Sequence, residues 1–381
     1  MVIQACAVRR PAEAGAPNLA KGRRLGQQLR GAFLALLCVS LAGPLLADSA
    51  PDVLAQPAAK LIEPGRAVLL GITRAGDRLV AVGERGIILL SDDHGSSWRQ
   101  GSVPVRISLT DVQFVDERHG WAVGHSGVVL HSRDGGETWN LQLDGRQAAA
   151  LELEAAEREA GPGSQRLDNA RLLVDDGPDK PFLVVHFSDA RNGIVAGAFG
   201  MAFRTRDGGE TWSSIIGRLP NDWGAHLYAI ASRDRHLYIA GEQGLFMRST
   251  DDGTSFEAVE TGYEGSYFTL ALLPADALLV GGLRGTVMLS DDAGESFRML
   301  DNPVPVSLND AVTLDDRLLL VNQAGGLLEV AGGSLRPLPV RAGAPLSAVA
   351  RTADGGVVGV GFNGPVSLSP LTPANAHASA E

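Results

Sequence analysis

The chain contains many variants of one unit of about 40 residues, a period that is typical of circular or stacked repeat arrays. The unit is clearest at residues 119–139, where two short strands joined by a Gly-x-x-Gly turn precede the motif Ser-x-Asp-x-Gly-x-Thr-Trp. Weaker copies of the motif end at Trp98, Trp212, Phe256 and Phe297. This repeat constrains the fold more than any other feature of the sequence.

The Gly-x-x-Gly turn gives the number of units. Its second glycine recurs at spacings of 39 to 44 residues, apart from one interval of 73 that indicates an insert at residues 146–180. The seven turns lie at Gly83–Gly86, Gly124–Gly127, Gly197–Gly200, Gly241–Gly244, Gly282–Gly285, Asn322–Gly325 and Gly361–Gly364.

Each unit has the pattern of four short strands, with apolar and β-branched runs between glycine and aspartate turns. In the second unit these are Leu109–Phe114, Gly120–Gly124, Val128–Ser132 and Thr138–Leu143. Four strands at this period predict an all-β fold, a seven-bladed β-propeller. A stacked β-solenoid is the alternative, but it uses shorter repeats and needs no aromatic residue at the end of every unit.

We expect the propeller to span residues 48–370 as one domain, followed by a disordered tail at 371–381. The seventh unit, Leu346–Ser369, runs out after about three strands. A strand from Val53–Ile62 is therefore expected to complete the last blade and close the ring.

The insert falls in the link between the second and third blades. Gln147–Ala160 is rich in Ala, Leu and Glu and is predicted to be helical, with Gly161-Pro162-Gly163 ending the helix. Its larger apolar residues form no clean stripe, so we expect the helix to be only partly docked. Both a solvated excursion and a lid beside the propeller mouth fit this pattern.

The repeated aspartates are predicted to be structural. A short carboxylate in a tight hairpin can accept hydrogen bonds from its own turn, and the following glycine supplies the backbone angles. A catalytic acid–base pair is needed once, whereas these aspartates recur in blade after blade, which argues against both catalysis and calcium binding. They are Asp93, Asp134, Asp207, Asp251 and Asp292.

Residues 1–47 have the pattern of a secretory signal peptide, with basic residues ahead of an apolar run from Gly31 to Ala47. The protein is therefore expected to be exported to a periplasmic or lumenal space. An uncleaved membrane anchor is the alternative, although the run is short and is broken by Gly43 and Pro44. Cys38 follows Leu37 rather than the small residue expected before a lipoprotein cysteine.

Charge and cysteine content exclude several classes of function. Both cysteines, Cys6 and Cys38, lie in the leader, so the mature chain would have no disulfide and no thiol chemistry. Loss of residues 1–47 moves the formal charge from −11 to −16, because six basic groups and one acidic group leave. An acidic exported protein is a poor partner for nucleic acid.

One block of residues resembles a known family: Gly120-Trp121-Ala122-Val123-Gly124, then Gly127, then Asp134-Gly135-Gly136-x-Thr138-Trp139. It is similar to the repeat of the photosystem II stability/assembly factor-like propellers, within the wider Asp-box (BNR) group. The resemblance covers about residues 66–370. It implies a non-enzymatic exported propeller that binds a membrane-protein client or complex. We expect a monomer without cofactor that meets the membrane only through this client.

The Asp-box group also contains sialidases, so a glycan-acting hydrolase is the alternative function. In sialidases a tyrosine nucleophile acts with the help of a glutamate, and an arginine triad binds the substrate carboxylate. No tyrosine in this sequence has a convincing glutamate partner, and Tyr228 and Tyr238 are expected to pack within strands. His125 and His131 have poor spacing for a metal site. We therefore predict neither enzyme activity nor a metal centre.

Binding is expected on the face that carries the turns between second and third strands and the links between blades. Trp223 is the residue least easily explained as core, since Pro220–Gly224 is a turn-rich link. Arginine and aromatic side chains are enriched at interface hot spots. The predicted partner-binding residues are Arg85, Arg106, His125, Phe199, Trp223, Tyr263, Arg284 and Phe362.

Overall fold

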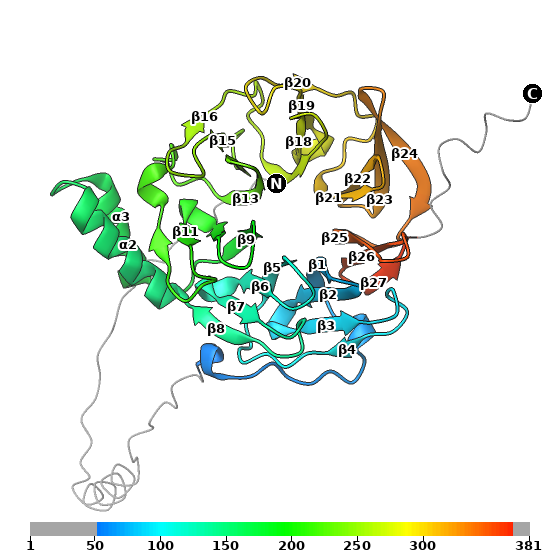
Figure 1. The fold of residues 1–381 in the computed structure, drawn as a ribbon, viewed down its shortest axis with the longest axis horizontal. Helices are drawn as coiled ribbons and strands as arrows, with labels where there is room; N and C mark the ends of the chain where they lie inside the picture. The colour runs from blue at the N-terminus through cyan, green and yellow to red at the C-terminus, as the bar shows by residue number, and fades with distance from the viewer. Residues whose placement is uncertain (1–51, 369–381) are drawn as a thin grey trace, which may run out of the picture. The chain divides into compact units, whose positions relative to one another are not determined.

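A computed structural model describes residues 52–368, which form a seven-bladed β-propeller (Figure 1). Seven antiparallel sheets follow one another around the ring, and each is built from consecutive strands of the chain. The predicted fold class and number of blades are confirmed. The predicted leader at 1–47, with both cysteines, and the predicted tail at 371–381 lie outside the described residues.

The first three blades contain strands β1 to β12. They are β1 (Leu69–Ala75), β2 (Arg78–Gly83), β3 (Ile88–Ser91) and β4 (Arg99–Gln100) in blade 1; β5 (Leu109–Phe114), β6 (Gly120–Gly124), β7 (Val129–Ser132) and β8 (Asn140–Leu143) in blade 2; and β9 (Phe182–Phe187), β10 (Gly193–Gly197), β11 (Ala202–Thr205) and β12 (Ser213–Ser214) in blade 3.

The remaining blades contain strands β13 to β27. They are β13 (Leu227–Arg233), β14 (His236–Gly241), β15 (Phe246–Ser249) and β16 (Glu257–Ala258) in blade 4; β17 (Tyr267–Leu272), β18 (Leu278–Gly282), β19 (Val287–Ser290) and β20 (Arg298–Met299) in blade 5; β21 (Leu308–Leu314), β22 (Arg317–Asn322), β23 (Gly326–Ala331) and β24 (Ser334–Arg341) in blade 6; and β25 (Leu346–Arg351), β26 (Val357–Gly361) and β27 (Gly364–Ser367) in blade 7.

Short 3₁₀ turns lie between the strands and ahead of the first blade. They are η1 (Val53–Ala55), η2 (Pro64–Arg66), η3 (Glu84–Gly86), η4 (His125–Gly127), η5 (Ala198–Gly200), η6 (Ile216–Arg218) and η7 (Leu283–Gly285).

Blade 7 closes the ring with three described strands, and the prediction that Val53–Ile62 supplies a fourth is wrong. That segment follows the outer part of blade 1 instead: the Leu61 amide donates to the Gln100 side chain at 2.9 Å, and the Ala58 amide donates to the Val103 carbonyl at 3.1 Å. Pro57 interrupts the segment and removes a backbone donor that a strand would use.

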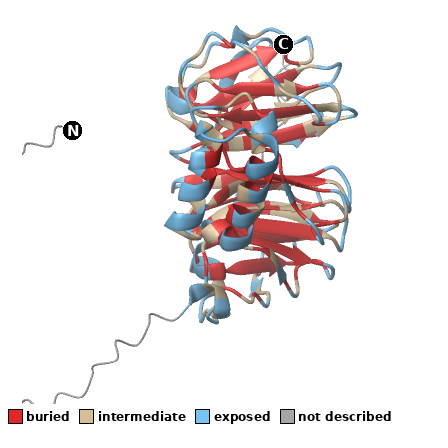
Figure 2. Cartoon of the chain, turned by 90° about the vertical axis from the view of Figure 1, so that its left-hand side faces the viewer, coloured by how far each residue is buried: buried red, intermediate tan, exposed pale blue. Residues whose placement is uncertain are grey.

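Apolar side chains hold the ring shut where its first and last blades meet. Leu69 and Leu89 of blade 1 pack in one buried cluster with Val358 and Val360 of blade 7. A comparable cluster lies at every boundary between neighbouring blades, so the core is distributed around the ring as layers between the sheets (Figure 2). Burial of these side chains contributes roughly 25 cal/mol per Å² of apolar surface removed from water.

The Asp-box hairpins share one hydrogen-bond network, illustrated by blade 2. Asp134 accepts the Thr138 amide at 3.0 Å and the Thr138 hydroxyl at 2.6 Å, while Ser132 Oγ donates to Asp134 and accepts the amide of Gly136. Gly136 has a φ of +89°, which a residue with a Cβ rarely adopts. The box therefore fixes a turn, and the side chains of Ser132, Asp134 and Thr138 hydrogen-bond within that turn.

The same contacts recur in blades 1, 3, 4 and 5. In blade 1 the hydroxyl hydrogen bond from Ser97 lowers the pKa of Asp93 to about 2, and the corresponding bond from Ser296 does the same for Asp292 in blade 5. The carboxylates at Asp207 and Asp251 accept from Thr211 and Ser255 in the same way.

The insert forms two helices, α2 (Gly145–Glu159) and α3 (Gln165–Asp176), that pack together beside blade 3 (Figure 1). The expectation of a partly docked helix is wrong, because the buried face of α2 is made of small residues: Gly145, Ala148, Ala149, Ala155 and Ala156. Glu152 is buried among them. Its carboxylate accepts hydrogen bonds from the Arg166 side chain of α3 and from the Ser214 hydroxyl of β12.

Candidate partner-binding face

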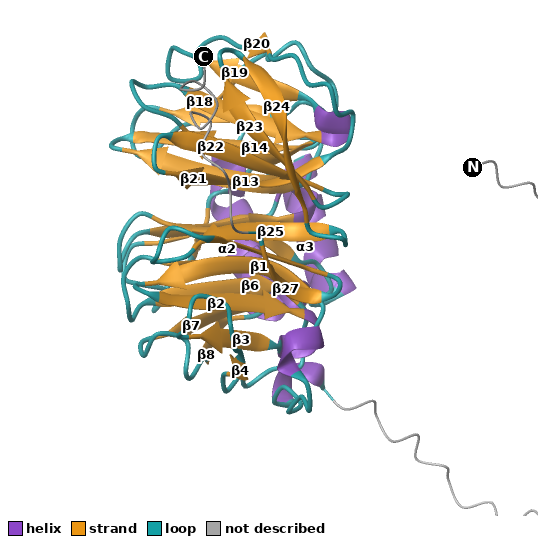
Figure 3. Cartoon of the chain, turned by 90° about the vertical axis from the view of Figure 1, so that its right-hand side faces the viewer, coloured by secondary structure: helices purple, strands orange, loops and turns teal. Residues whose placement is uncertain are grey.

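The eight predicted partner-binding residues all lie on turns between second and third strands or on links between blades. These segments leave the antiparallel sheets at the same end, so they form one face of the propeller. In Figure 3, α2 and α3 lie on the side where most of the short 3₁₀ turns gather. We call this side the turn-and-link face.

Arg85, Arg106 and His125 form one group on this face, at blades 1 and 2. The Arg85 amide donates to Ser108 Oγ at 3.4 Å, and the His125 amide donates to the Ser108 carbonyl at 2.9 Å. Both turns therefore rest on the link that carries Arg106. All three side chains are exposed, and the two guanidinium groups make no ion pair within residues 52–368.

Tyr263 and Arg284 form a second group, at blades 4 and 5. The Tyr263 hydroxyl donates to the Leu283 carbonyl at 3.0 Å, which brings its half-buried ring against the turn that carries Arg284. Arg284 is exposed and also lacks an ion-pair partner in the described part of the chain. Phe362 lies apart from both groups, exposed on the turn between β26 and β27.

Phe199 and Trp223 form the third group, at blade 3, where each has 59% of its surface exposed. Phe199 lies in η5, and the link that carries Trp223 packs against this turn. The two segments are so close that a Cβ added to Gly200 would lie 2.7 Å from Asn221 Nδ2. The eight predicted residues thus share a face but divide into separate groups around it.

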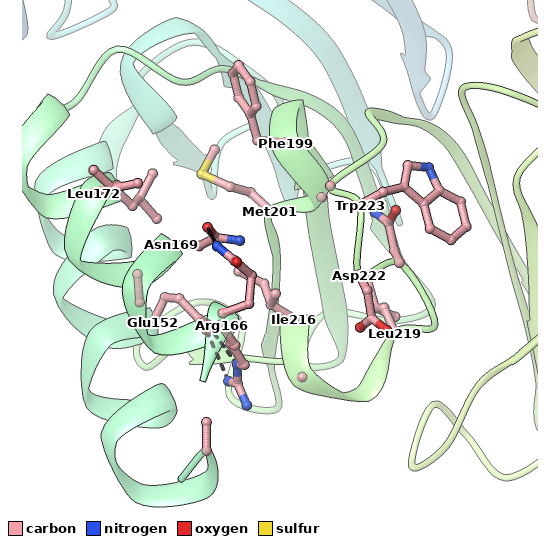
Figure 4. A pocket seen from close by; sticks show the side chains of 18 of the residues that line it. Glu152, Arg166, Asn169, Leu172, Phe199, Met201, Ile216, Leu219, Asp222 and Trp223 are labelled. Atoms are coloured by element: carbon pink, nitrogen blue, oxygen red, sulfur yellow. Dashed lines mark hydrogen bonds and ion pairs between the residues drawn. The ribbon is translucent and has the colours of Figure 1, made fainter. Parts of the chain in front are cut away.

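A groove of about 790 Å³ lies between α3 and the blade 3 elements η5, β11 and the 216–224 link (Figure 4). Leu172 extends from α3 toward Met201, and Ile216 and Leu219 form the opposite wall. Phe199 and Trp223 stand at its edges, with the Trp223 indole directed away from α3. The size falls within the usual range for ligand pockets, about 300–1,000 Å³.

Phe199 has a φ of +55°, a left-handed conformation that is costly for a residue with a bulky side chain. Arg85, Ser126, Gln243 and Arg284 occupy the same position in other blades with similar angles. The fold therefore imposes the conformation, and blade 3 alone among these five places an aromatic ring there. Lys180 Nζ lies 5.4 Å from the centre of that ring, a cation–π contact.

Sequence reasoning missed α3 and the groove wall that it supplies. A signal was present: Ser164 is a typical N-cap, and Leu167, Ala170 and Leu173 follow at helical spacing. In the structure Ser164 Oγ accepts the Leu167 amide at 3.3 Å, and Leu167 and Ala170 are buried.

Tyr228 has a glutamate neighbour that the sequence did not reveal. Its hydroxyl lies 3.3 Å from Glu242. Burial, and to a smaller extent the negative charge of this carboxylate, raises the pKa of Tyr228 to about 12. The Glu242 carboxylate also accepts the His226 amide at 3.0 Å. A nucleophilic tyrosine must lose its proton near neutral pH, whereas the raised pKa keeps the Tyr228 hydroxyl protonated there.

The two histidines considered as metal ligands have different environments. His125 is exposed, whereas His131 is buried and stacks on Trp121 with 4.6 Å between ring centres. Burial lowers the pKa of His131 to about 4. Residues 52–368 contain no group of three or more His, Cys, Asp or Glu side chains arranged to hold a metal ion.

Sequence reasoning also missed two half-buried carboxylates in the innermost strands. Asp111 in β5 accepts the Val185 amide of blade 3, and Asp310 in β21 accepts the Val349 amide of blade 7, each at 2.9 Å. Each aspartate follows an irregularity in strand pairing at the same position of its blade. They link neighbouring blades, and burial raises the pKa of both.

The family model described as photosynthesis system II assembly factor YCF48 matches residues 90–157 and 173–264. These ranges contain the boxes of blades 1 to 4 and part of the insert. Together they cover less than half of the chain, and over them the chain is similar to that family.

Among curated proteins, the chain is similar to the photosystem II assembly lipoprotein Ycf48 of Synechococcus sp. (strain CC9902). The two are 30% identical over 117 residues, which is 30% of this chain. The match spans about a third, 35%, of the length of that relative.

Solved structures share the fold. YCF48 from Cyanidioschyzon merolae has a TM-score of 0.59 at 14% identity, covering 84% of this chain and 100% of its own. A YCF48 bound to D1 peptide has a TM-score of 0.57 at 16% identity, covering 83% and 99%. The RRP9 WD40 repeats reach 0.56 at 10%, covering 80% and 92%, which shows that this likeness reports the fold alone.

Within residues 52–368, every helix is too short or too polar to span a bilayer.

Proposed function

We propose that this protein is a non-enzymatic, exported assembly scaffold whose turn-and-link face captures an extended segment of a membrane-protein client. The observation that carries the proposal is the blade 3 group, where Phe199 and Trp223 are both exposed on rigid turns beside a preformed groove. Large exposed aromatic side chains next to a concave surface are typical of protein-binding sites.

The charge on this face supports capture of a client. Arg85, Arg106 and Arg284 project from rigid turns and links without an ion-pair partner among the described residues. Guanidinium groups of this kind bind carboxylates or carbonyl oxygens of a partner without first giving up an internal contact. The related YCF48 structure bound to D1 peptide supports a membrane-protein segment as the client class.

The alternative, an Asp-box glycan hydrolase, has less support. The raised pKa of Tyr228 disfavours a nucleophile at the one tyrosine found beside a glutamate carboxylate in the described structure. The box aspartates accept hydrogen bonds from their own turns, as Asp134 does from Thr138. Export rests on the sequence pattern of residues 1–47.

Affinity capture from detergent-solubilised membranes tests the scaffold function. The baits are the unchanged protein, Trp223→Ala and Met299→Ala, the last being a matched control with 60% exposure on the outer strand of blade 5. We expect one membrane complex to be recovered by the unchanged protein and by Met299→Ala, and to be lost with Trp223→Ala. Recovery that is equal for all three baits would overturn the proposed face.

Binding to peptides that tile the exported loops of the recovered protein then identifies the captured segment. Release of reducing sugar from glycan substrates, abolished by Tyr228→Phe, would instead establish the hydrolase.

A further inference from the structure

The groove at blade 3 is built from parts of the chain that the propeller repeat does not require. One wall is α3, which belongs to the insert, and the other is the 216–224 link, which is longer than the equivalent link after blade 1. The other described blades have no such helix pair. The concave surface is therefore a local addition to the fold.

Both walls are held rigidly. Asn221 Oδ1 accepts the Ala225 amide at 2.9 Å and its Nδ2 donates to the Ala225 carbonyl at 3.0 Å, which fixes the link on either side of Trp223. On the opposite wall, Arg166 donates to Glu152 and Glu159 at 2.9 and 3.0 Å, tying α3 to α2. A rigid, preformed groove lowers the entropic cost of binding.

The groove has an apolar floor and an acidic lining. Leu172, Met201, Ile216 and Leu219 supply apolar contact surface. Four acidic side chains outnumber two basic ones in the lining: Glu152, Glu159, Asp176 and Asp222 against Arg166 and Lys180.

Most of these charges are already paired inside the protein. Arg166 pairs with both glutamates, and Lys180 Nζ lies 3.0 Å from Asp176. Asp222 is exposed, and within residues 52–368 its carboxylate has no hydrogen bond or ion pair. An unpaired carboxylate at the edge of an apolar groove favours a ligand that carries a positive charge beside an apolar group.

We propose that this groove is a subsite for a short extended peptide segment in which a leucine- or phenylalanine-like side chain is adjacent to a lysine or arginine. The apolar side chain fills the space between Leu172, Met201 and Ile216, and the cation pairs with Asp222. The inference rests on the proposed function and deepens it, since the segment belongs to the captured client. The three unpaired arginines, Arg85, Arg106 and Arg284, lie on other blades and would select acidic residues. Different parts of the face would therefore bind client residues of opposite charge.

The test uses fluorescence anisotropy of the purified protein with the labelled peptide Gly-Ser-Leu-Lys-Phe-Ser-Gly. Three further peptides replace Lys by Gln, Lys by Glu, or both apolar residues by Ser. We expect the first peptide to bind most tightly, the glutamine peptide to bind more weakly, and the other two to bind weakest.

Two exposed substitutions test the site without touching the core. Leu172→Ser should weaken binding of the lysine peptide about tenfold, through lost apolar contact. Asp222→Asn should weaken it about threefold, as for an exposed ion pair, and should leave the glutamine peptide unaffected. Asp234→Asn, an exposed carboxylate on the opposite side of blade 4 without a partner in the described structure, is the matched control and should change nothing.

Several outcomes would overturn the subsite. They are equal affinity for the lysine and glutamate peptides, no binding of any peptide at about 1 mM, an Asp222→Asn effect that is the same for the lysine and glutamine peptides, or a stable dimer in sedimentation that excludes peptide as protein concentration rises.

Failure of the subsite is distinguishable from failure of the proposed function. If membrane capture depends on Trp223 but not on Leu172 or Asp222, the scaffold stands and the subsite falls. If the lysine peptide binds as described while no membrane complex is captured, the subsite stands for soluble peptides and the scaffold function falls.

Discussion

The carboxylate of Asp310 accepts a hydrogen bond from the backbone amide of Val349, 2.9 Å away, across the boundary between blades 6 and 7. Its other oxygen accepts the Ala311 amide at 2.8 Å. The side chain keeps some accessible surface, but the surrounding blades enclose it, and this burial raises its pKa to about 7, with a smaller contribution from Asp111. The raised pKa gives this blade boundary a pH dependence.

Asp310 should make stability fall as pH rises from about 4 to about 7. The pKa of this carboxyl is higher in the folded protein than its ordinary value of 3.8, so the folded state binds the proton more tightly in that window. The contribution of this carboxyl to the free energy of unfolding is fully present below its pKa in the unfolded chain. It is lost as the pH rises through its pKa in the folded protein. Urea unfolding at a series of pH values measures it.

Asp310→Asn removes this titration, so the stability difference between unchanged protein and variant should shrink or reverse between pH 5 and pH 8. The control Asp301→Asn, at an exposed carboxylate in the link before blade 6, should show a constant difference. A constant difference for Asp310→Asn as well would contradict the assignment.

Trp139 closes the box of blade 2, where its ring lies buried against Phe114 with 5.8 Å between ring centres. Trp139→Ala should lower the free energy of unfolding by about 3–5 kcal/mol, because a large buried side chain is lost. Trp139→Phe should cost less, since Phe256 and Phe297 hold this position in other blades and the main loss is the Nε1 hydrogen bond to the Gly136 carbonyl. That loss is worth about 1 kcal/mol. Equal costs for both variants in urea unfolding would refute the packing argument.

Glu152 attaches the helix pair to blade 3. Glu152→Gln should weaken this attachment by about 1–3 kcal/mol, because the Arg166 guanidinium loses its buried counter-charge. Hydrogen exchange should then accelerate across α2 and α3 while the amides of β5 to β7 stay protected. The reference is Glu154→Gln, whose carboxylate is exposed on the same helix. Faster exchange throughout the propeller would mean that the insert supports the whole ring.

Phe199→Asn should separate stability from binding. Asparagine tolerates the left-handed conformation better than phenylalanine, so the free energy of unfolding should stay unchanged or rise by up to about 1 kcal/mol. Client capture should fall because the exposed ring is lost. Gln243→Asn makes the same backbone test in blade 4 and should leave capture intact. A loss of stability with Phe199→Asn would show that the ring supports the fold.

Cleavage of the predicted signal peptide, residues 1–47, can be measured directly. Export should remove residues 1–47, so intact-protein mass spectrometry of the exported form should give a chain that begins at Asp48. Leu36→Arg within the apolar run should leave the protein unprocessed. An exported chain that retains its first 47 residues would support the anchor alternative.

The repeated features of the fold were predictable because each is specified locally. The glycine turns and the Ser-x-Asp-x-Gly box fix hairpins through contacts within a few residues, as Asp134 and Thr138 illustrate. Ring closure could not be predicted this way. It depends on Leu69 and Val358, far apart in sequence, packing without a shared strand.

The candidate site was predictable in part. The position of each turn in the repeat places Phe199 and Arg284 on one face, because strand direction alternates. The sequence did not reveal the groove, since it depends on how α3 packs through small residues and one buried carboxylate, Glu152. The buried alanines of α2 carry little periodic signal, and the partners of Asp310 and Tyr228 lie in other segments of the chain.

The distribution of the core into layers between neighbouring sheets limits how a protein of this type can vary. Removing one blade would delete two apolar layers and leave two unmatched sheet faces, so the number of blades cannot change by small steps. A link between blades contributes no sheet to those layers and can lengthen freely. The helix pair of residues 145–176 occupies such a link. New binding surfaces on this scaffold can therefore arise by growth at the links while the ring itself is preserved.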